Sequence, residues 1–286
     1  MGRKVIVTCA LVGSATRKKQ NPSVPYSPKE LAEAAALAYQ AGAAMVHVHA
    51  VEDDGTNSIR IERIKESHDA VKDRTPALIV NMTSALGPGA TPALRLAQIE
   101  AVRPEMASLN MATMNFAAVD RKTNEVLMDY TFENSLVMIA QFAARMKEIG
   151  TKPELEVYST AGIDNYYAIE GRGSFTDPVN FNFVWGVCGG TTFRPETFVA
   201  MRQSLPPGAN FSTCGVGSDE WPAVTQSVLC GGHVRVGLED NIRMPGGELA
   251  KGNYELVENA VRIVRALGHE PATPDEARAI MGTSRR

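Results

Sequence analysis

The sequence predicts a (β/α)₈ barrel, and two observations carry this prediction. Strand-like and helix-like segments alternate about eight times from end to end. The length of 286 residues suits such a barrel, which runs to about 250 residues as one unit. The alternation favours a closed barrel over an open doubly wound sheet, and no Pro/Ser-rich linker interrupts it. We therefore expect one domain over residues 1–286.

The elements follow from local patterns. The strand candidates are short, apolar and rich in Val and Ile, as expected for strands that are covered on both faces. Amphipathic stretches between them have the periodicity of helices. The predicted strands are 4–11, 45–50, 77–83, 106–112, 153–159, 180–187, 210–216 and 233–239. The predicted helices are 28–41, 60–73, 92–102, 134–149, 161–171, 195–204, 220–230 and 252–267.

Helix ends carry matching signals. The segment Ser27–Glu30 is a capping box with proline in the first turn. Gly42, Gly150 and Gly268 each follow a predicted helix where a left-handed C-cap is favoured. Two segments fall outside the repeat, and we interpret them as an insertion near 113–133 and a C-terminal extension over 269–286.

Composition excludes several classes of protein. The net charge of −3 is too small for a nucleic-acid surface or a polybasic membrane anchor, and no apolar run is long enough to span a membrane. The apolar start of the chain resembles a secretory signal but fits better as a buried first strand. The cysteines are scattered without a C-x-x-C pair, which indicates reduced thiols and a cytoplasmic protein. They are Cys9, Cys188, Cys214 and Cys230.

Ionisable residues at period-two spacing indicate a metal site. In a strand, residues i and i+2 project from the same face about 6.6 Å apart, so His47 and His49 can aim at one point. Glu239, at the end of the last predicted strand, can add an oxygen, because the last and second strands both flank the first in a closed barrel. Two histidines and one carboxylate leave a fourth position open, as a catalytic zinc requires. A lone strand histidine is more often structural, but the pair with a carboxylate favours a metal.

Other polar residues cluster at predicted strand ends, where barrel active sites lie. Isolated buried charges are costly, so these groups require partners or a metal. Glu156 is the better functional candidate, whereas Glu154 is expected near solvent at the strand start. Arg235 could instead form a structural ion pair. The set comprises Asn81, Thr83, Ser108, Asn110, Glu156, Tyr158, Arg235 and Asp240.

Nucleotide-binding motifs are missing from the sequence. There is neither G-x-G-x-x-G nor a P-loop. Glycine pairs do follow the last three predicted strands, at Gly189-Gly190, Gly215-Val216-Gly217 and Gly246-Gly247. The last loops of such barrels often bind phosphate, but loop glycines are common and this indication is weak.

Several segments resemble the β-keto acid cleavage enzyme family, whose type activity is 3-keto-5-aminohexanoate cleavage. The resemblance runs in order along nearly the whole chain, and its most specific part is the last strand. The matching segments are Asn21–Glu30, His47–His49 followed by Asp53–Gly55, Arg103–Asn110, Pro153–Val157 and Gly231–Asn241.

The resemblance implies a zinc-dependent condensation of a β-keto acid with acetyl-CoA, giving acetoacetate and a new acyl-CoA. It implies that His47, His49 and Glu239 bind Zn²⁺ and that Asp240 is the base, oriented by Arg235. It also implies a homo-oligomer, a dimer or a tetramer, with no redox cofactor. The resemblance further implies that Thr83 and Glu156 take part in catalysis and that Ser108, Asn110 and Ser14 bind the substrate.

The chain departs from the family pattern at three places. Members that take an amino substrate carry a glutamate two residues after the first-strand glycine, but here Gly13 is followed by Ser14 and Ala15. This departure disfavours an ammonium-bearing substrate. Val51 stands where many members have arginine, and Ser84–Leu86 replaces a glycine-rich turn.

Three other functions are alternatives to this one. A metal-dependent aldolase or Claisen-type lyase would use the same ligands without CoA. A hydrolase of the amidohydrolase type needs further histidines, and none occurs between His68 and His233. A non-catalytic binding barrel would not predict ionisable groups converging at strand ends.

Overall fold

The computed structural model, which describes residues 2–120 and 122–286, is a barrel of eight parallel strands. Hydrogen-bonded neighbours follow the order β10-β9-β8-β5-β4-β3-β2-β11. The two end strands, β10 and β11, meet where the His233 amide donates to the Phe211 carbonyl at 2.7 Å. The strands are β2 (Val7–Ala10), β3 (Met45–Val48), β4 (Ile79–Met82), β5 (Met106–Asn110), β8 (Lys152–Val157), β9 (Asn180–Trp185), β10 (Asn210–Gly215) and β11 (Val234–Val236).

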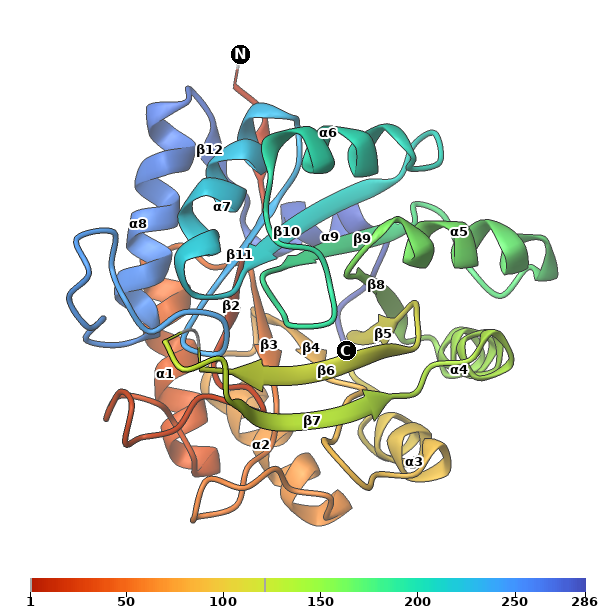
Figure 1. The fold of residues 1–286 in the computed structure, drawn as a ribbon, viewed down its shortest axis with the longest axis horizontal. Helices are drawn as coiled ribbons and strands as arrows, with labels where there is room; N and C mark the ends of the chain where they lie inside the picture. The colour runs from red at the N-terminus through yellow and green to blue at the C-terminus, as the bar shows by residue number, and fades with distance from the viewer. Residues whose placement is uncertain (1, 121) are drawn as a thin grey trace.

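Helices surround this barrel, as Figure 1 shows. The predicted helix signals are confirmed at α1, where Ser27 accepts from the Glu30 amide, and Gly42 and Gly150 are left-handed C-caps. The helices after the strands are α1 (Pro28–Ala41), α2 (Ile61–Arg74), α3 (Pro92–Val102), α4 (Leu136–Ile149), α5 (Thr160–Ile169), α6 (Pro195–Gln203), α7 (Glu220–Leu229) and α8 (Asn253–Ala266). The predicted (β/α)₈ barrel is therefore confirmed.

The first predicted strand, 4–11, is divided in two. Its start forms β1 (Lys4–Val5), which pairs in parallel with β12 (Glu270–Pro271), while β2 belongs to the barrel. One continuous apolar run thus serves two sheets, because its first residues bind the C-terminal segment rather than a barrel strand.

The C-terminal segment covers the N-terminal ends of the strands, which we call the barrel floor. Helix α9 (Pro274–Met281) packs Ala277 and Met281 against Met45 and Ile79, at the starts of β3 and β4. Arg278 also enters this layer, where its guanidinium binds the buried carboxylate of Glu105.

The insertion forms an antiparallel hairpin of β6 (Met114–Val119) and β7 (Val126–Phe132). In Figure 1 this hairpin crosses in front of the barrel. The Ala117 amide donates to the Cys188 carbonyl at 3.3 Å, which ties the hairpin to the loop after β9. The hairpin therefore lies over the C-terminal ends of the strands, which we call the barrel mouth. Within the described residues, no helix is both long and apolar enough to cross a membrane.

Candidate active site

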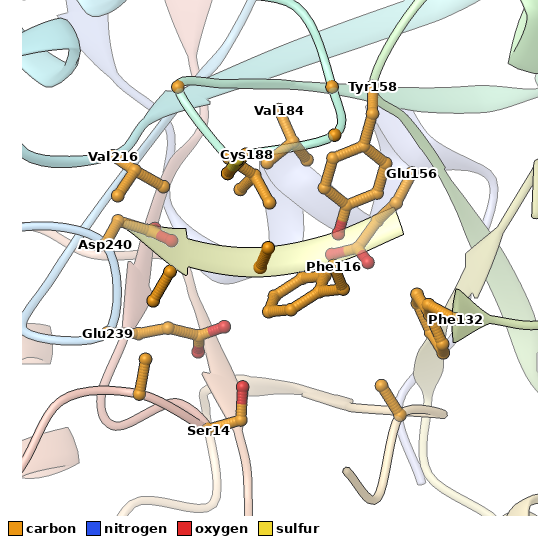
Figure 2. Close-up of a pocket in the computed structure, with 18 of the residues that line it drawn as sticks. Ser14, Phe116, Phe132, Glu156, Tyr158, Val184, Cys188, Val216, Glu239 and Asp240 are labelled. Carbon is orange, nitrogen blue, oxygen red and sulfur yellow. The ribbon is translucent and has the colours of Figure 1, made fainter. Parts of the chain in front are cut away.

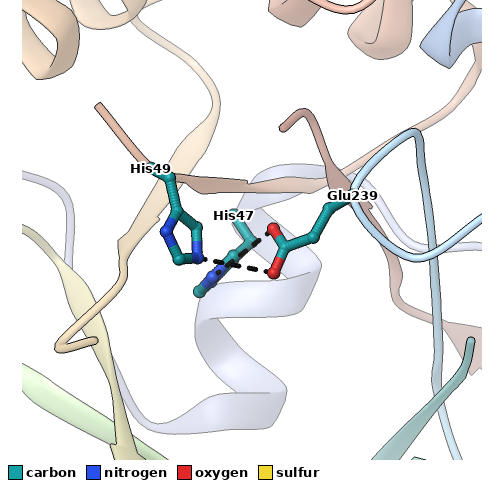
Figure 3. Close-up of side chains that lie close together, drawn as sticks. All are labelled: His47, His49 and Glu239. Atoms are coloured by element: carbon teal, nitrogen blue, oxygen red, sulfur yellow. Dashed lines mark ion pairs between the residues drawn. The ribbon is translucent and has the colours of Figure 1, made fainter. Parts of the chain in front are cut away.

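Two imidazoles and a carboxylate meet at the barrel mouth (Figure 3). His47 lies on β3, His49 follows that strand, and Glu239 follows β11. Their potential ligand atoms all lie within 4.8 Å of one another. The Nε2 atom of His47 is 3.8 Å from Oε2 of Glu239, and that of His49 is 3.4 Å from Oε1. The structure thus brings together all three predicted metal ligands.

The backbone around Glu239 holds its side chain against the histidines. The Glu239 amide donates to the Ala10 carbonyl at 3.2 Å, and Thr16 Oγ1 donates to the Glu239 carbonyl at 3.1 Å. A Cβ atom at Gly13 would lie 2.3 Å from Cγ of Glu239. Position 13 therefore has to be glycine for the carboxylate to reach this place.

The donor set fits a divalent metal ion such as zinc. Oε2 of Glu239 is buried and has no hydrogen-bond partner among the described residues, which is costly unless something binds it. Burial lowers the pKa of His47 well below its usual value, so this imidazole is neutral, the form that binds metals. Two nitrogens and one oxygen with space beside them match a catalytic zinc site.

Arg235 links the metal ligand to two further acids. Its guanidinium lies 2.8 Å from Glu239 Oε1, 3.1 Å from Glu156 Oε1 and 2.8 Å from Asp240 Oδ2. A second bond to Asp240 Oδ1 at 3.0 Å makes that pair bidentate. Burial opposes the charge, but Asp240 and Glu239 raise the pKa of Arg235 well above its usual value. The guanidinium therefore remains a fixed cation among three carboxyl groups.

The three acids differ in protonation. Burial would raise the pKa of Glu239, but Arg235 and His49 lower it below its usual value. Burial raises the pKa of Asp240 to about 6, and the nearby Glu239 carboxylate adds to the rise. Burial raises the pKa of Glu156 to about 8. The site thus combines an ionised ligand with two carboxyl groups able to exchange protons near neutral pH.

These groups line a cavity of about 550 Å³, which we call the first cavity. In Figure 2, Glu156, Glu239 and Asp240 point into the same space, with Phe116 and Phe132 beside it. The polar side is formed by strand ends, whereas the hairpin supplies an apolar wall. The hairpin residues that line the cavity are Phe116, Ala117, Ala118, Val119, Met128, Tyr130 and Phe132.

The other predicted site residues divide into two groups. Thr83 and Ser14 line the first cavity. Ser108 and Asn110 are buried in β5 and are not among the residues that line it. Ser108 Oγ accepts a hydrogen bond from the Ser84 amide at 3.2 Å. The roles of Ser108 and Asn110 in substrate binding stay predictions.

The expectation for Glu154 was wrong. This residue is only 2% exposed, and its carboxyl group accepts a hydrogen bond from Asn81 Nδ2 at 2.6 Å. Its position near the strand start suggested solvent, but the residue lies inside the barrel, where burial raises the pKa of the carboxyl group.

The hairpin was the main omission from the predicted site. The segment 113–133 is predicted only as an insertion into the barrel, yet it forms one wall of the first cavity. Met128, Tyr130 and Phe132 alternate along β7. This period-two pattern of large apolar side chains was the available signal that one face of the hairpin is covered.

The fold and the site together define a barrel enzyme with a candidate metal centre. A family model described as beta-keto acid cleavage enzyme matches residues 4–283. The chain is 38% identical over 282 residues to the 3-keto-5-aminohexanoate cleavage enzyme of Acetoanaerobium sticklandii, with 99% of each chain covered. It is 30% identical to the 3-dehydrocarnitine:acetyl-CoA trimethylamine transferase of Rhizobium meliloti, over 100% of this chain and 99% of the relative.

The solved apo structure of ObcA has the same fold, with a TM-score of 0.73 and 23% sequence identity over 92% of this chain. The present chain covers 66% of that chain. The family match and the relatives establish that this chain belongs to the beta-keto acid cleavage enzyme family. It is an enzyme that cleaves a carbon–carbon bond of a β-keto acid.

Proposed function

We propose that this enzyme condenses a β-keto acid with acetyl-CoA and releases acetoacetate and a new acyl-CoA. Its family and a relative named for an acetyl-CoA-dependent transfer support the two substrates. The observation that carries the proposal is the buried Asp240 carboxyl group, held by two bonds to Arg235 beside the His47–His49–Glu239 cluster.

The metal in this proposal is zinc, held by His47, His49 and Glu239. The unpartnered Oε2 atom of Glu239 and the mutual approach of the three ligand atoms support it. A bound zinc ion would supply Lewis acidity, which stabilises the negative charge that develops on a substrate oxygen.

Asp240 acts as the general base. The carbon between the carboxylate and the keto group of the substrate is acidic, and Asp240 takes its proton. Arg235 holds this carboxyl group through Nε and Nη2. Glu156 binds Nη1 of the same guanidinium, and we assign it and Thr83 to the catalytic set because both line the first cavity.

The bonds balance without a redox step. The deprotonated carbon forms a bond to the acetyl carbonyl carbon, and the CoA thiolate leaves. The thiolate then attacks the original keto carbon, and the bond between that carbon and the former nucleophilic carbon breaks. The carbanion that this cleavage releases takes back the proton held by Asp240. The products are acetoacetate and an acyl-CoA that carries the remainder of the β-keto acid.

We propose a substrate whose far end is neutral and apolar. The acids that line the first cavity are Glu156, Glu239 and Asp240, and each already contacts Arg235. Ala15 lines the cavity where members with amino substrates carry a glutamate. The hairpin adds aromatic and aliphatic surface on the opposite side, which suits an apolar chain.

The decisive experiment incubates the purified protein with acetyl-CoA and a panel of β-keto acids and measures acetoacetate. We expect acetoacetate and a matching acyl-CoA only when both substrates are present. Cleavage that proceeds equally without acetyl-CoA would replace the proposal by the metal-dependent lyase. No acetoacetate with any member of a broad panel would contradict it.

We further propose a cytoplasmic homo-oligomer, a dimer or a tetramer. Four free cysteines support a reducing compartment. Large apolar side chains are exposed on the hairpin and at the start of α4, namely Val126, Leu127, Leu136 and Val137, and exposed apolar surface of this kind favours association. Light scattering of the purified protein measures the oligomeric state.

A further inference from the structure

Arg95 on α3 is a buried cation at the place where the hairpin joins the barrel. The residue is only 4% exposed, and its guanidinium binds neutral oxygens and none of the described carboxylates. We propose that Arg95 is a positioning residue that fixes the hairpin over the first cavity and thereby sets the length of β-keto acid that the enzyme accepts. This inference rests on the proposed apolar end of the substrate.

The guanidinium of Arg95 joins two segments that lie far apart in the sequence. Its Nε atom donates to the Ser84 carbonyl at 2.9 Å. Its Nη1 atom donates to the Glu133 carbonyl at 2.9 Å, and Nη2 donates to Asn134 Oδ1 at 2.7 Å. Ser84 belongs to the loop after β4, whereas Glu133 and Asn134 directly follow β7. One rigid fork therefore holds the end of the hairpin against the loop after β4.

Asn134 extends this restraint to both strands of the hairpin. Its backbone amide donates to Thr113 Oγ1 at 2.8 Å, and its Nδ2 atom donates to the Ala112 carbonyl at 3.2 Å. The same Nδ2 atom donates to the Phe132 carbonyl at 3.3 Å. Ala112 and Thr113 precede β6, and Phe132 ends β7. Arg95 thus holds the start and the end of the hairpin through a single asparagine.

The loop after β4 carries the polar side of the first cavity near Arg95. Thr83 and Ala85, which flank Ser84, both line the cavity. Gln98, also on α3, donates from Nε2 to the Thr83 carbonyl at 2.9 Å. Helix α3 therefore fixes this loop and the hairpin together. The separation between Thr83, which we assign to the catalytic set, and the apolar wall depends on the contacts of Arg95.

The guanidinium also lies against the aromatic wall itself. Its Cζ atom is 4.9 Å from the ring centroid of Phe132 and 5.4 Å from that of Phe142 on α4. A cation within about 6 Å of a ring face is attracted to it. Phe132 contacts Phe116 with ring centroids 6.1 Å apart, and both rings lie beside the first cavity (Figure 2). The position of Arg95 therefore sets where the wall meets the end of the substrate chain.

A buried cation without a carboxylate partner is costly to the fold. Burial lowers the pKa of Arg95 to about 10, so the guanidinium remains charged at neutral pH. An apolar side chain would pack against Phe132 and Phe142 without this cost, but it would supply no donors to Ser84 and Asn134. Such departures from the rules of burial are expected where a residue serves function.

Two variants separate position from charge. Arg95→Lys keeps the charge, but its compact ammonium cannot span the three oxygens, and Arg95→Met removes both. The measured quantity is the ratio of kcat/KM between the preferred β-keto acid and its homologue that is longer by two methylene groups. We expect both variants to lower this ratio about tenfold, since one methylene in a fitted pocket accounts for at least that factor. Loss of folded enzyme lowers both rates alike and leaves the ratio unchanged.

A milder variant and a matched control accompany them. Thr113→Val removes the acceptor of the Asn134 amide and leaves Arg95 in place, so it should lower the ratio by a smaller factor. Arg262→Lys is the control, because Arg262 is an exposed arginine on α8 that pairs with Glu258 and does not line the first cavity. It should leave the ratio unchanged. The bound zinc should be the same in all four variants.

Hydrogen exchange of the amides in β6 and β7 tests the restraint without any substrate. These amides should lose protection in Arg95→Lys and Arg95→Met but not in Arg262→Lys. Wild-type protection in both Arg95 variants would overturn the restraint, and lost protection with a wild-type ratio would overturn the effect on chain length. A wild-type ratio in Arg95→Lys with a lower one in Arg95→Met would assign the effect to charge and overturn the positioning role.

The same data distinguish failure of this inference from failure of the proposed substrate. If the best substrate has a charged far end, the proposed apolar end fails. Lost protection and a lower ratio among the accepted substrates in Arg95→Lys would still support the positioning role. A preference for apolar substrates that is equal in wild type and both Arg95 variants supports the proposed substrate and overturns this inference.

Discussion

Two buried arginines lie at opposite ends of the barrel in opposite charge environments. At the floor, Arg278 donates to Glu105 at 2.7 and 3.0 Å, and Lys72 reaches the same carboxylate at 2.8 Å. At the mouth, Arg235 is one cation among three buried or nearly buried carboxyl groups. The floor therefore has enough positive charge for its buried acid, whereas the mouth has an excess of acidic groups.

This difference separates a structural ion pair from a reactive site. A buried acid with two cationic partners has its charge fully paired within the fold. An excess of buried acids remains unfavourable until a metal or a proton neutralises it. Burial is the main cause of the raised pKa values of Asp240 and Glu156, and the neighbouring acids add to the rise. Substitutions at the floor should thus change the stability of the fold, whereas substitutions at the mouth should change metal binding and catalysis.

The largest effect is expected at the metal ligands. His47→Ala or Glu239→Ala should lose the bound zinc and the acetoacetate-forming activity while retaining the fold, because each removes one of three ligands. Elemental analysis, circular dichroism and the acetoacetate assay measure the three properties. Glu258→Ala, which changes a half-exposed acid on α8 that pairs with Arg262, is the control. Wild-type metal content in both ligand variants would refute the assigned site.

At the floor, Arg278→Ala should lower the free energy of unfolding by about 3–5 kcal/mol, because it leaves a buried carboxylate short of its main partner. The kcat of the folded protein should stay unchanged, since Arg278 lies at the opposite end from the first cavity. Denaturant unfolding compares this variant with Arg262→Ala. That control removes an exposed ion pair between Arg262 and Glu258 on α8, which is worth at most about 1 kcal/mol. Equal stability of the two variants would contradict the structural role of the floor pair.

Substitution of the proposed base, Asp240, at the mouth should lower activity and leave stability unchanged. Asp240→Asn should keep the metal and the substrate affinity but lower kcat by at least about 10²-fold, the lower range for loss of a general base. Stability should change little, because the amide keeps the shape of the side chain. The control is Asp69→Asn, a surface acid on α2 beside Lys65. A wild-type rate in Asp240→Asn would remove this residue from the mechanism.

The smallest of these effects concerns the far end of the substrate. We expect a neutral β-keto acid to exceed 3-keto-5-aminohexanoate in kcat/KM by about 10²-fold, since an unpaired ammonium in a closed pocket costs several kcal/mol. Ala15→Glu should narrow or reverse this preference. If the wild-type enzyme prefers the amino substrate, as the name of its relative at 38% identity suggests for that protein, another acid supplies the negative charge.

Much of the barrel was predictable because its signals are local. Short apolar runs, amphipathic stretches and residues such as Ser27 and Gly42 act within a few positions, so the predicted strands and helices overlap the observed ones, with shifts of a few residues at their ends. The pairing of His47 with His49 is local as well, since alternate residues of one strand share a face. Their approach to Glu239 was also predictable, because barrel closure makes the first strand the neighbour of both the second and the last.

Other features depend on contacts between distant segments, and only the tertiary structure decided them. The sequence alone did not indicate that Arg278 would bind Glu105, 173 positions earlier, that Glu154 would be buried, or that the hairpin would cover the first cavity. It also did not indicate a second cavity, of about 560 Å³, that Asp240 lines together with the loops after β10 and β11. Local patterns encode the elements of the fold, whereas burial and cavity shape arise from packing between segments that share no sequence pattern.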